Sequence, residues 1–188
     1  LYLRGRHLFH QRTPESLEQA SREFAAAMEH DPGFPPAYSG YADARLLLSG
    51  YGNLDAETAR RQAEEALRRG LAIGQDVAEI NASLGLLNAF SGEMDAAERA
   101  YRRALELDPD YAMAHMWLGT TLHAQGRLRE ALAAFDHSEE RAPCHPIVGV
   151  NRATVLVDLG RYVAGMRLLD ELAERNADSG QIHRHASL

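Results

Sequence analysis

The chain has 188 residues, of which 27 are acidic and 20 are basic, and its formal net charge is −7. Every basic residue is an arginine, and the arginines are interleaved with glutamates, which argues against direct nucleic-acid binding by this segment. No apolar run reaches the ~18 residues of a membrane helix, and the single cysteine, Cys144, rules out an internal disulfide.

A period of 34 residues runs through the chain. Glycines recur at this spacing at Gly92, Gly126 and Gly160, and Gly85 is followed by Gly119 at the same distance. A fixed period of this length indicates an array of repeats. We therefore predict one domain over residues 1–179, made of five repeats at 1–34, 35–77, 78–111, 112–145 and 146–179. Residues 180–188 are expected to start a further helix or to form a tail.

The first two repeats depart from this period. Asp31-Pro32 closes the first repeat, and the same dipeptide returns at Asp108-Pro109, which is two periods and nine residues later. We assign the nine extra residues to the second repeat, near the stretch SGYGN at 49–53. Because this glycine-rich stretch follows an expected helix and not a strand, we interpret it as a lengthened turn and not as a phosphate-binding loop.

The third and fourth repeats show the full pattern of two helices. The first helix is indicated by i, i+3, i+4, i+7 spacing at Asn81, Leu84, Gly85 and Asn88, and the fourth repeat shows the same spacing. After the glycine turn, Ala97, Tyr101 and Ala104 mark a second helix, which a proline ends. The fifth repeat keeps Ala153, Leu156 and Gly160.

This repeat resembles the tetratricopeptide repeat (TPR). The likeness is strongest within 78–145, in NASLGLLNAFSGEMDAAERAYRRALELDP, and weaker on either side. The resemblance implies an all-α fold, a right-handed superhelical array of antiparallel helix pairs. In such an array the first helix of each pair lines a concave groove.

The opening of the chain resembles a more particular group. Tyr2-Leu3-Arg4-Gly5-Arg6 and Pro36-Ala37-Tyr38 are similar to the TPR region that follows the effector domain in CadC-type transcription regulators, adenylate cyclases and serine/threonine kinases of bacteria. This resemblance implies a sensory or interaction segment of a larger signalling or transcription-regulatory protein. It does not identify the effector domain.

The candidate site is a surface. In the TPR resemblance, residues between the packing positions of the first helices face the groove or its margin. In this chain they are Leu86, Phe90, Met113, Met116, Trp117, Thr120, His123, Asn151 and Thr154. Met and aromatic side chains favour an adaptable binding surface. These apolar side chains are explained equally well if a following repeat or a second copy of the domain covers the surface.

Trp117 is the most specific member of this set. It stands where the preceding repeat has Ser83, so the packing of the repeat does not demand it. One interpretation is a buried anchor for a partner, since such anchors are enriched in Trp. The other is that the ring fills a gap against the next first helix, near Val150.

We predict no catalytic, metal or cofactor site. His115 and His123 are expected on one helix face, but the 1.5 Å rise places them ~12 Å apart, too far to share an ion. No G-x-S-x-G or H-E-x-x-H motif occurs. An enzyme or a metal sensor is therefore the less favoured function. The lysine-lined carboxylate clamp of the co-chaperone subset of TPR proteins is not expected in a chain without lysine.

We therefore expect a non-enzymatic interaction or sensory domain that binds a protein, peptide or small ligand in the groove. The alternative is a self-association module, in which the apolar face forms a homodimer. The chain reads as a piece of a longer bacterial protein. A cytoplasmic location is favoured, and a periplasmic one fits a segment attached to a membrane-spanning regulator.

Overall fold

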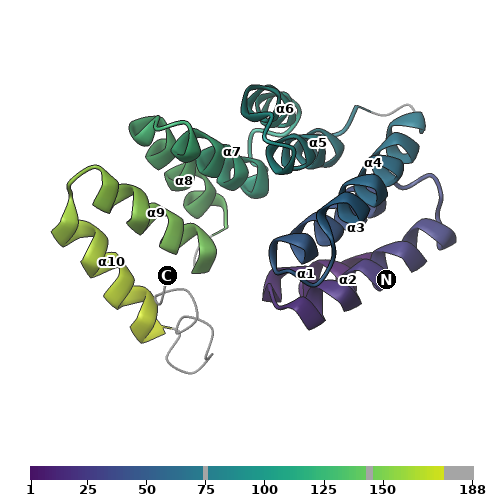
Figure 1. The fold of residues 1–188 in the computed structure, drawn as a ribbon, viewed down its shortest axis with the longest axis horizontal. Helices are drawn as coiled ribbons and strands as arrows, with labels where there is room; N and C mark the ends of the chain where they lie inside the picture. The colour runs from purple at the N-terminus through teal and green to yellow at the C-terminus, as the bar shows by residue number, and fades with distance from the viewer. Residues whose placement is uncertain (74–75, 143–145, 176–188) are drawn as a thin grey trace. The chain divides into compact units, whose positions relative to one another are not determined.

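The computed structural model describes residues 1–73, 76–142 and 146–175, and within these ranges it contains helices and no strands (Figure 1). This confirms the all-α prediction. Cys144 and the tail at 180–188 lie outside the described residues. The helices are α1 (Tyr2–Gln11), α2 (Pro14–His30), α3 (Pro35–Gly50), α4 (Ala56–Ala72), α5 (Ala78–Phe90), α6 (Met94–Leu107), α7 (Ala112–Ala124), α8 (Leu128–Arg141), α9 (Pro146–Asp158) and α10 (Tyr162–Arg175).

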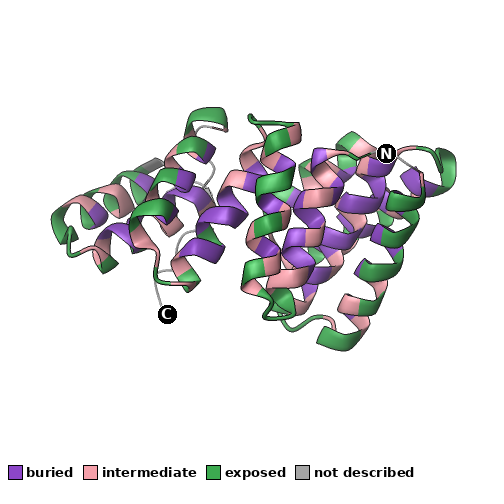
Figure 2. Cartoon of the chain, turned by 90° about the horizontal axis from the view of Figure 1, so that it is seen from above, coloured by how far each residue is buried: buried purple, intermediate pink, exposed green. Residues whose placement is uncertain are grey.

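Consecutive helices pack in pairs, α1 with α2, α3 with α4, and so on to α9 with α10. The chain divides into two compact units, an N-terminal unit of Leu1–Pro109 and a C-terminal unit that begins at Asp110. In the N-terminal unit, α3 also packs against α2 and α5, and in the C-terminal unit α9 also packs against α8. Figure 2 shows buried residues along the inner helix faces and exposed residues on the opposite faces. The single domain at 1–179 stays a prediction.

Aromatic rings of the second helices pack directly against glycines of the first helices. A Cβ atom at Gly119 would lie 2.8 Å from Cε1 of Phe135, and one at Gly5 or Gly40 would lie 2.8 or 2.7 Å from Phe24. Phe24 and Phe135 are both fully buried. The absence of a side chain at these glycines therefore lets α1, α3 and α7 approach their neighbours closely.

Four of the turns between paired helices share one backbone geometry. Gly52, Gly92, Gly126 and Gly160 have φ values between 74° and 80°, the left-handed region that glycine adopts without steric cost. In each turn the next residue donates its N–H to a carbonyl of the preceding helix, as Glu93 does to Asn88 at 2.8 Å. This is the hydrogen-bond pattern that commonly ends a helix at a glycine.

The turn between α1 and α2 is built differently. Arg12 takes the left-handed conformation there with φ 55°, and Thr13 and Ser16 cap α2 reciprocally. The Ser16 N–H donates to Thr13 Oγ1 at 3.1 Å, and the Thr13 N–H donates to Ser16 Oγ at 3.0 Å. This capping box satisfies two backbone donors that a helix N-terminus would otherwise leave unpaired.

The nine-residue insertion does not lie in the turn alone. Helices α3 and α4 have 16 and 17 residues, whereas α5 and α6 have 13 and 14. The extra residues continue a buried face of α3, because Leu48 lies four residues after Ala44 and both are buried. Our interpretation of SGYGN as a lengthened turn therefore accounts for only a part of the insertion, because apolar residues at helical spacing extend the helices instead.

We expect Gly119→Leu to destabilise the protein by about 1–3 kcal/mol or more, because the new side chain overlaps the buried ring of Phe135. Urea denaturation measures this free energy. Thr120→Leu is the matched control, since it adds a similar side chain at the next, exposed position of α7. Wild-type stability in Gly119→Leu would contradict the packing described above.

Candidate functional site

The structure places the nine candidate groove residues in two groups. Four are buried, with exposed fractions of at most 8%: Leu86, Met113, Met116 and Trp117. Five are exposed or half-buried: Phe90, Thr120, His123, Asn151 and Thr154. Leu86 and Phe90 belong to the N-terminal unit and the other seven to the C-terminal unit. Only the second group offers its side chains to a partner in this structure.

Polar groups join the two first helices of the C-terminal unit. His123 Nε2 of α7 lies 2.6 Å from Asp158 Oδ2 of α9, and this contact is partly exposed. Thr120 and Thr154 stand 34 residues apart on α7 and α9, and both are exposed. Their hydroxyls donate to carbonyls of their own helices, at Met116 and Val150. The exposed part of this face thus carries short side chains beside a histidine that contacts Asp158.

A second cluster of polar side chains, not singled out from the sequence, lies in the N-terminal unit. Arg12 follows α1, Asp43 lies in α3 and Ser83 lies in α5. Asp43 is 5% exposed and Ser83 is fully buried. Within the described residues, Arg12 Nε and Nη2 and Asp43 Oδ1 are buried atoms without a hydrogen-bond partner. We call these three residues the Arg12 cluster.

Charge interactions hold the Arg12 cluster together without a direct ion pair. Burial raises the pKa of Asp43 to about 7, and a hydrogen bond with the Ser83 hydroxyl and the charges of Arg12 and Arg6 limit that rise. Burial also lowers the pKa of Arg12 to about 10, against the opposing effect of Tyr51 and Asp43. The Arg12 guanidinium lies 4.5 Å from the centre of the Phe9 ring. The ring holds the cation in place from one side.

The Arg12 cluster carries a cost in stability. An unpartnered buried donor or acceptor costs roughly 1–3 kcal/mol, and a left-handed backbone at a residue other than glycine costs about 1 kcal/mol more. Strain and unpaired polar groups concentrate at functional positions in proteins. The cluster is therefore a candidate binding site.

The sequence indicates one member of this cluster, Arg12, as unusual. Arg12 stands in the turn between two paired helices, where the later repeats have Gly92, Gly126 and Gly160. An arginine at a position that elsewhere is glycine is a departure from the repeat. No spacing rule links Asp43 and Ser83 to it, because the three residues come from three different parts of the repeat array.

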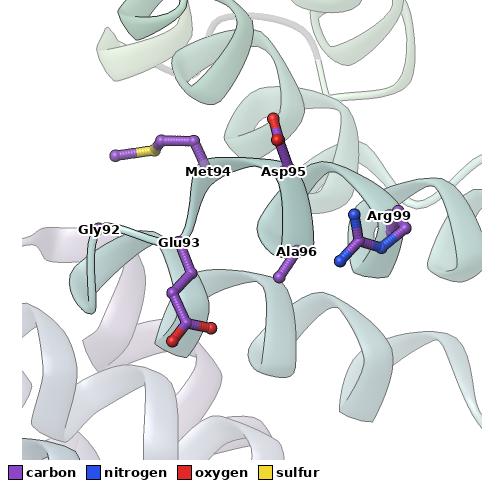
Figure 3. A pocket seen from close by; sticks show the side chains of 6 residues that line it. All are labelled: Gly92, Glu93, Met94, Asp95, Ala96 and Arg99. Carbon is purple, nitrogen blue, oxygen red and sulfur yellow. The ribbon is translucent and has the colours of Figure 1, made fainter.

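A shallow hollow at the N-terminus of α6 offers no comparable arrangement. Figure 3 shows the side chains of Glu93 and Asp95 on opposite sides of the chain. The residues that line the hollow are Gly92, Glu93, Met94, Asp95, Ala96 and Arg99. Among the described residues, no three His, Cys, Asp or Glu side chains are placed to hold a metal ion. No helix in the described ranges is long and apolar enough to cross a membrane.

Comparisons with known proteins agree with the repeat geometry. Residues 84–144 match the family model described as tetratricopeptide repeat. The TPR protein YrrB, whose structure is described as having an unusual peptide-binding site, is 21% identical with a TM-score of 0.59 over 93% of this chain and 85% of its own. The type IV pilus biogenesis factor PilW is 21% identical with a TM-score of 0.64, over 92% of this chain and 76% of its own.

A thermophilic TPR protein of Thermus thermophilus is 24% identical, with a TM-score of 0.60 over 77% of this chain and 82% of its own. No curated protein sequence matches the chain. The paired helices and these structural likenesses define a helical-repeat protein. Residues 84–144 match the tetratricopeptide repeat family model, and the fold of the chain is similar to that of these TPR proteins.

We expect Asp43→Asn to become more stable than the wild type as the pH rises. The raised pKa of about 7 means that the folded state favours the protonated acid. That stability is fully present below the unfolded pKa of about 4 and is lost as the pH rises through about 7. The advantage of Asp43→Asn in unfolding free energy should therefore grow between about pH 5 and pH 8, by at most about 1.4 kcal/mol per pH unit.

Urea denaturation over this pH range measures the advantage. Asp55→Asn is the control, because the hydrogen bond from Thr58 lowers the pKa of Asp55 and its contribution is complete above the unfolded pKa. The difference between Asp55→Asn and the wild type should stay constant over the same range. A constant difference for Asp43→Asn as well would mean that Asp43 is already ionised in the folded protein.

We expect Trp117→Ala to lower the free energy of unfolding by about 3–5 kcal/mol, because the ring is buried and its removal leaves a cavity. Chemical denaturation of this variant and of the exposed control Thr120→Ala measures the loss. A variant that keeps its stability but loses more than tenfold in partner affinity would instead identify Trp117 as an anchor for a partner.

Proposed function

We propose that this chain is a non-catalytic TPR module that binds a protein or peptide along the face formed by its first helices. The observation that carries the proposal is the TPR fold, which serves interactions with proteins and peptides in this family. In the C-terminal unit, the exposed first-helix residues Thr120 and Thr154 support this face as the binding surface. A peptide-binding site described for the structurally similar YrrB is consistent with it.

The C-terminal unit favours an extended peptide on this face. The short side chains of Thr120 and Thr154 allow a bound chain to approach α7 and α9 closely. His123 and Asp158 add polar groups between the same two helices. Half-buried Asn151 adds an amide with donor and acceptor atoms. A surface of this kind pairs with main-chain groups as well as with side chains.

We assign this module to a larger bacterial signalling or transcription-regulatory protein, on the resemblance of Tyr2–Arg6 and Pro36–Tyr38 to the TPR regions of such regulators. In that setting the bound protein, peptide or small ligand would be the signal that the module reports to the effector domain.

Self-association is the second candidate function, and α10 favours it. Tyr162, Val163 and Met166 are 64%, 77% and 54% exposed and lie on the same helix. Large apolar side chains that cluster on a surface mark interaction sites more often than isolated ones do. In a homodimer, these three side chains would be buried against the second copy. The first-helix face would stay free for a peptide.

A displayed peptide library selected on the purified domain tests peptide binding. We expect Thr154→Arg to weaken the selected peptides at least tenfold in fluorescence anisotropy, because the long charged side chain fills the space beside α7. Ala133→Arg is the matched control, since it places the same charge at an exposed position of the second helix α8. Equal weakening by both variants, or no selected peptide at all, would contradict the proposal.

Sedimentation velocity over a range of protein concentrations tests self-association. A dimer that Val163→Asp converts to a monomer would support the α10 patch as a contact between copies. A monomer at every concentration would remove the second candidate and leave peptide binding unaffected.

A further inference from the structure

Helix α10 exposes apolar side chains on a side that is better covered in the preceding second helix. The second helices α2, α4 and α8 each pack against the first helix that follows, namely α3, α5 and α9. Helix α10 is the last helix of the described residues. Its Tyr162 and Met166 are 64% and 54% exposed, whereas Leu128 and Leu132, one period earlier in α8, are half-buried.

An ion pair shows which side of a second helix meets the next first helix. Asp136 Oδ1 of α8 lies 2.6 Å from Arg152 Nε of α9, at ion-pair distance without hydrogen-bond geometry. Asp170 stands one period after Asp136 and is exposed. Tyr162, Met166 and Asp170 follow one another at four-residue spacing, which places them along one side of α10. The apolar side chains therefore lie on the same side as the carboxylate.

Helix α1 exposes the side of a first helix that is covered in α5. Leu3 and His7 lie two residues before and two residues after Gly5. Leu3 is 79% exposed and His7 is also exposed. The residues in the same places around the corresponding glycine of α5 are Ser83 and Leu87, which are 0% and 8% exposed. Helices α3 and α4 pack against α5, whereas no described helix precedes α1.

Arg4 of α1 is the counterpart of Arg152 of α9. Arg4 directly precedes Gly5, and Arg152 directly precedes Ala153, which takes the place of the glycine in α9. Arg4 Nη2 lies 3.2 Å from Glu23 Oε2, yet 68% of the Arg4 side chain is exposed. A guanidinium has five N–H donors, so it can meet a second carboxylate. Helix α1 therefore offers to another molecule the cation that α9 offers to α8.

The charges of α1 and α10 are complementary beyond this one pair. Helix α1 contains two arginines and no acidic residue. Helix α10 contains three acidic residues and two arginines. Opposite excess charges favour the contact of α10 with α1 over the contact of α10 with itself.

We propose that α10 of one copy of the chain docks against α1 of a second copy, in the way that α8 packs against α9 within the chain. Asp170 pairs with Arg4 of the second copy, and Tyr162 and Met166 cover its Leu3. This inference rests on self-association, the second function proposed above, and names the contact that carries it. Because two different surfaces meet, a pair of copies keeps one α1 and one α10 free, and further copies can add in a row.

Charge reversal tests this contact in sedimentation velocity over a range of protein concentrations. We expect the wild type to form dimers and then longer oligomers as the concentration rises. Arg4→Glu and Asp170→Arg should each raise the concentration needed for association at least tenfold, because like charges then meet. An equal mixture of the two variants should associate like the wild type, since every contact between unlike copies again joins opposite charges.

The controls separate the contact from general effects of charge and folding. Arg22→Glu reverses another exposed arginine in an ion pair, with Glu18 on α2, and should associate like the wild type. Leu3→Asp keeps the ion pair of Arg4 with Glu23 and should weaken association as Arg4→Glu does. Circular dichroism should show the same helix content for all variants, because the changed side chains are exposed in the free chain.

Three results would overturn the inference. A closed dimer that Arg4→Glu leaves intact would mean that α10 contacts a surface other than α1, and self-association would stand without this contact. A mixture of the two charge-reversed variants that stays monomeric would exclude the pairing of Asp170 with Arg4. A wild type that is monomeric at every concentration would remove both this inference and the second candidate function, while the peptide selection would still decide the first.

Discussion

Contact between a ring and a bare glycine sets the spacing of the helices in this protein. Phe24 is the clearest example, because its single ring meets Gly5 of α1 and Gly40 of α3. A side chain at either glycine would overlap the ring, so the two first helices pack around Phe24 only while both positions stay empty. Tyr101 at Gly85 and Phe135 at Gly119 repeat the same contact within their own helix pairs. These contacts hold the first and second helices together within each unit.

The sequence predicts this packing because the contact repeats. Gly85 and Gly119 are one period apart, and each precedes the aromatic residue that it contacts by the same number of residues. A prediction for one repeat can be checked against the same position in the next repeat. A residue that occurs only once offers no such check. The insertion near 49–53 shows the limit of this reasoning. The period detects nine extra residues, but only the structure shows that part of them lengthens α3, where Leu48 continues a buried face four residues after Ala44.

The candidate site is harder to predict, because it depends on the direction in which each side chain points from its helix. The repeat period does not fix that direction. The side chains of Leu86, Met113, Met116 and Trp117 are buried, since a small rotation of a helix moves a position from the face of a groove into the packing beneath it. The Arg12 cluster brings together residues from three separate parts of the chain, and its defining property is the burial of its polar atoms. That property belongs to the three-dimensional arrangement and leaves no pattern in the sequence beyond the unusual arginine.

The turn that holds Arg12 has a consequence at the level of the gene. The repeat requires a left-handed residue after its first helix, and glycine meets that requirement at Gly52, Gly92, Gly126 and Gly160. Glycine and arginine codons differ by a single base, so one nucleotide change exchanges the two residues. Arg12 shows that a residue other than glycine can take this conformation, and it places a cation in the turn between α1 and α2. A single base change can therefore place a positive charge in such a turn without inserting a residue.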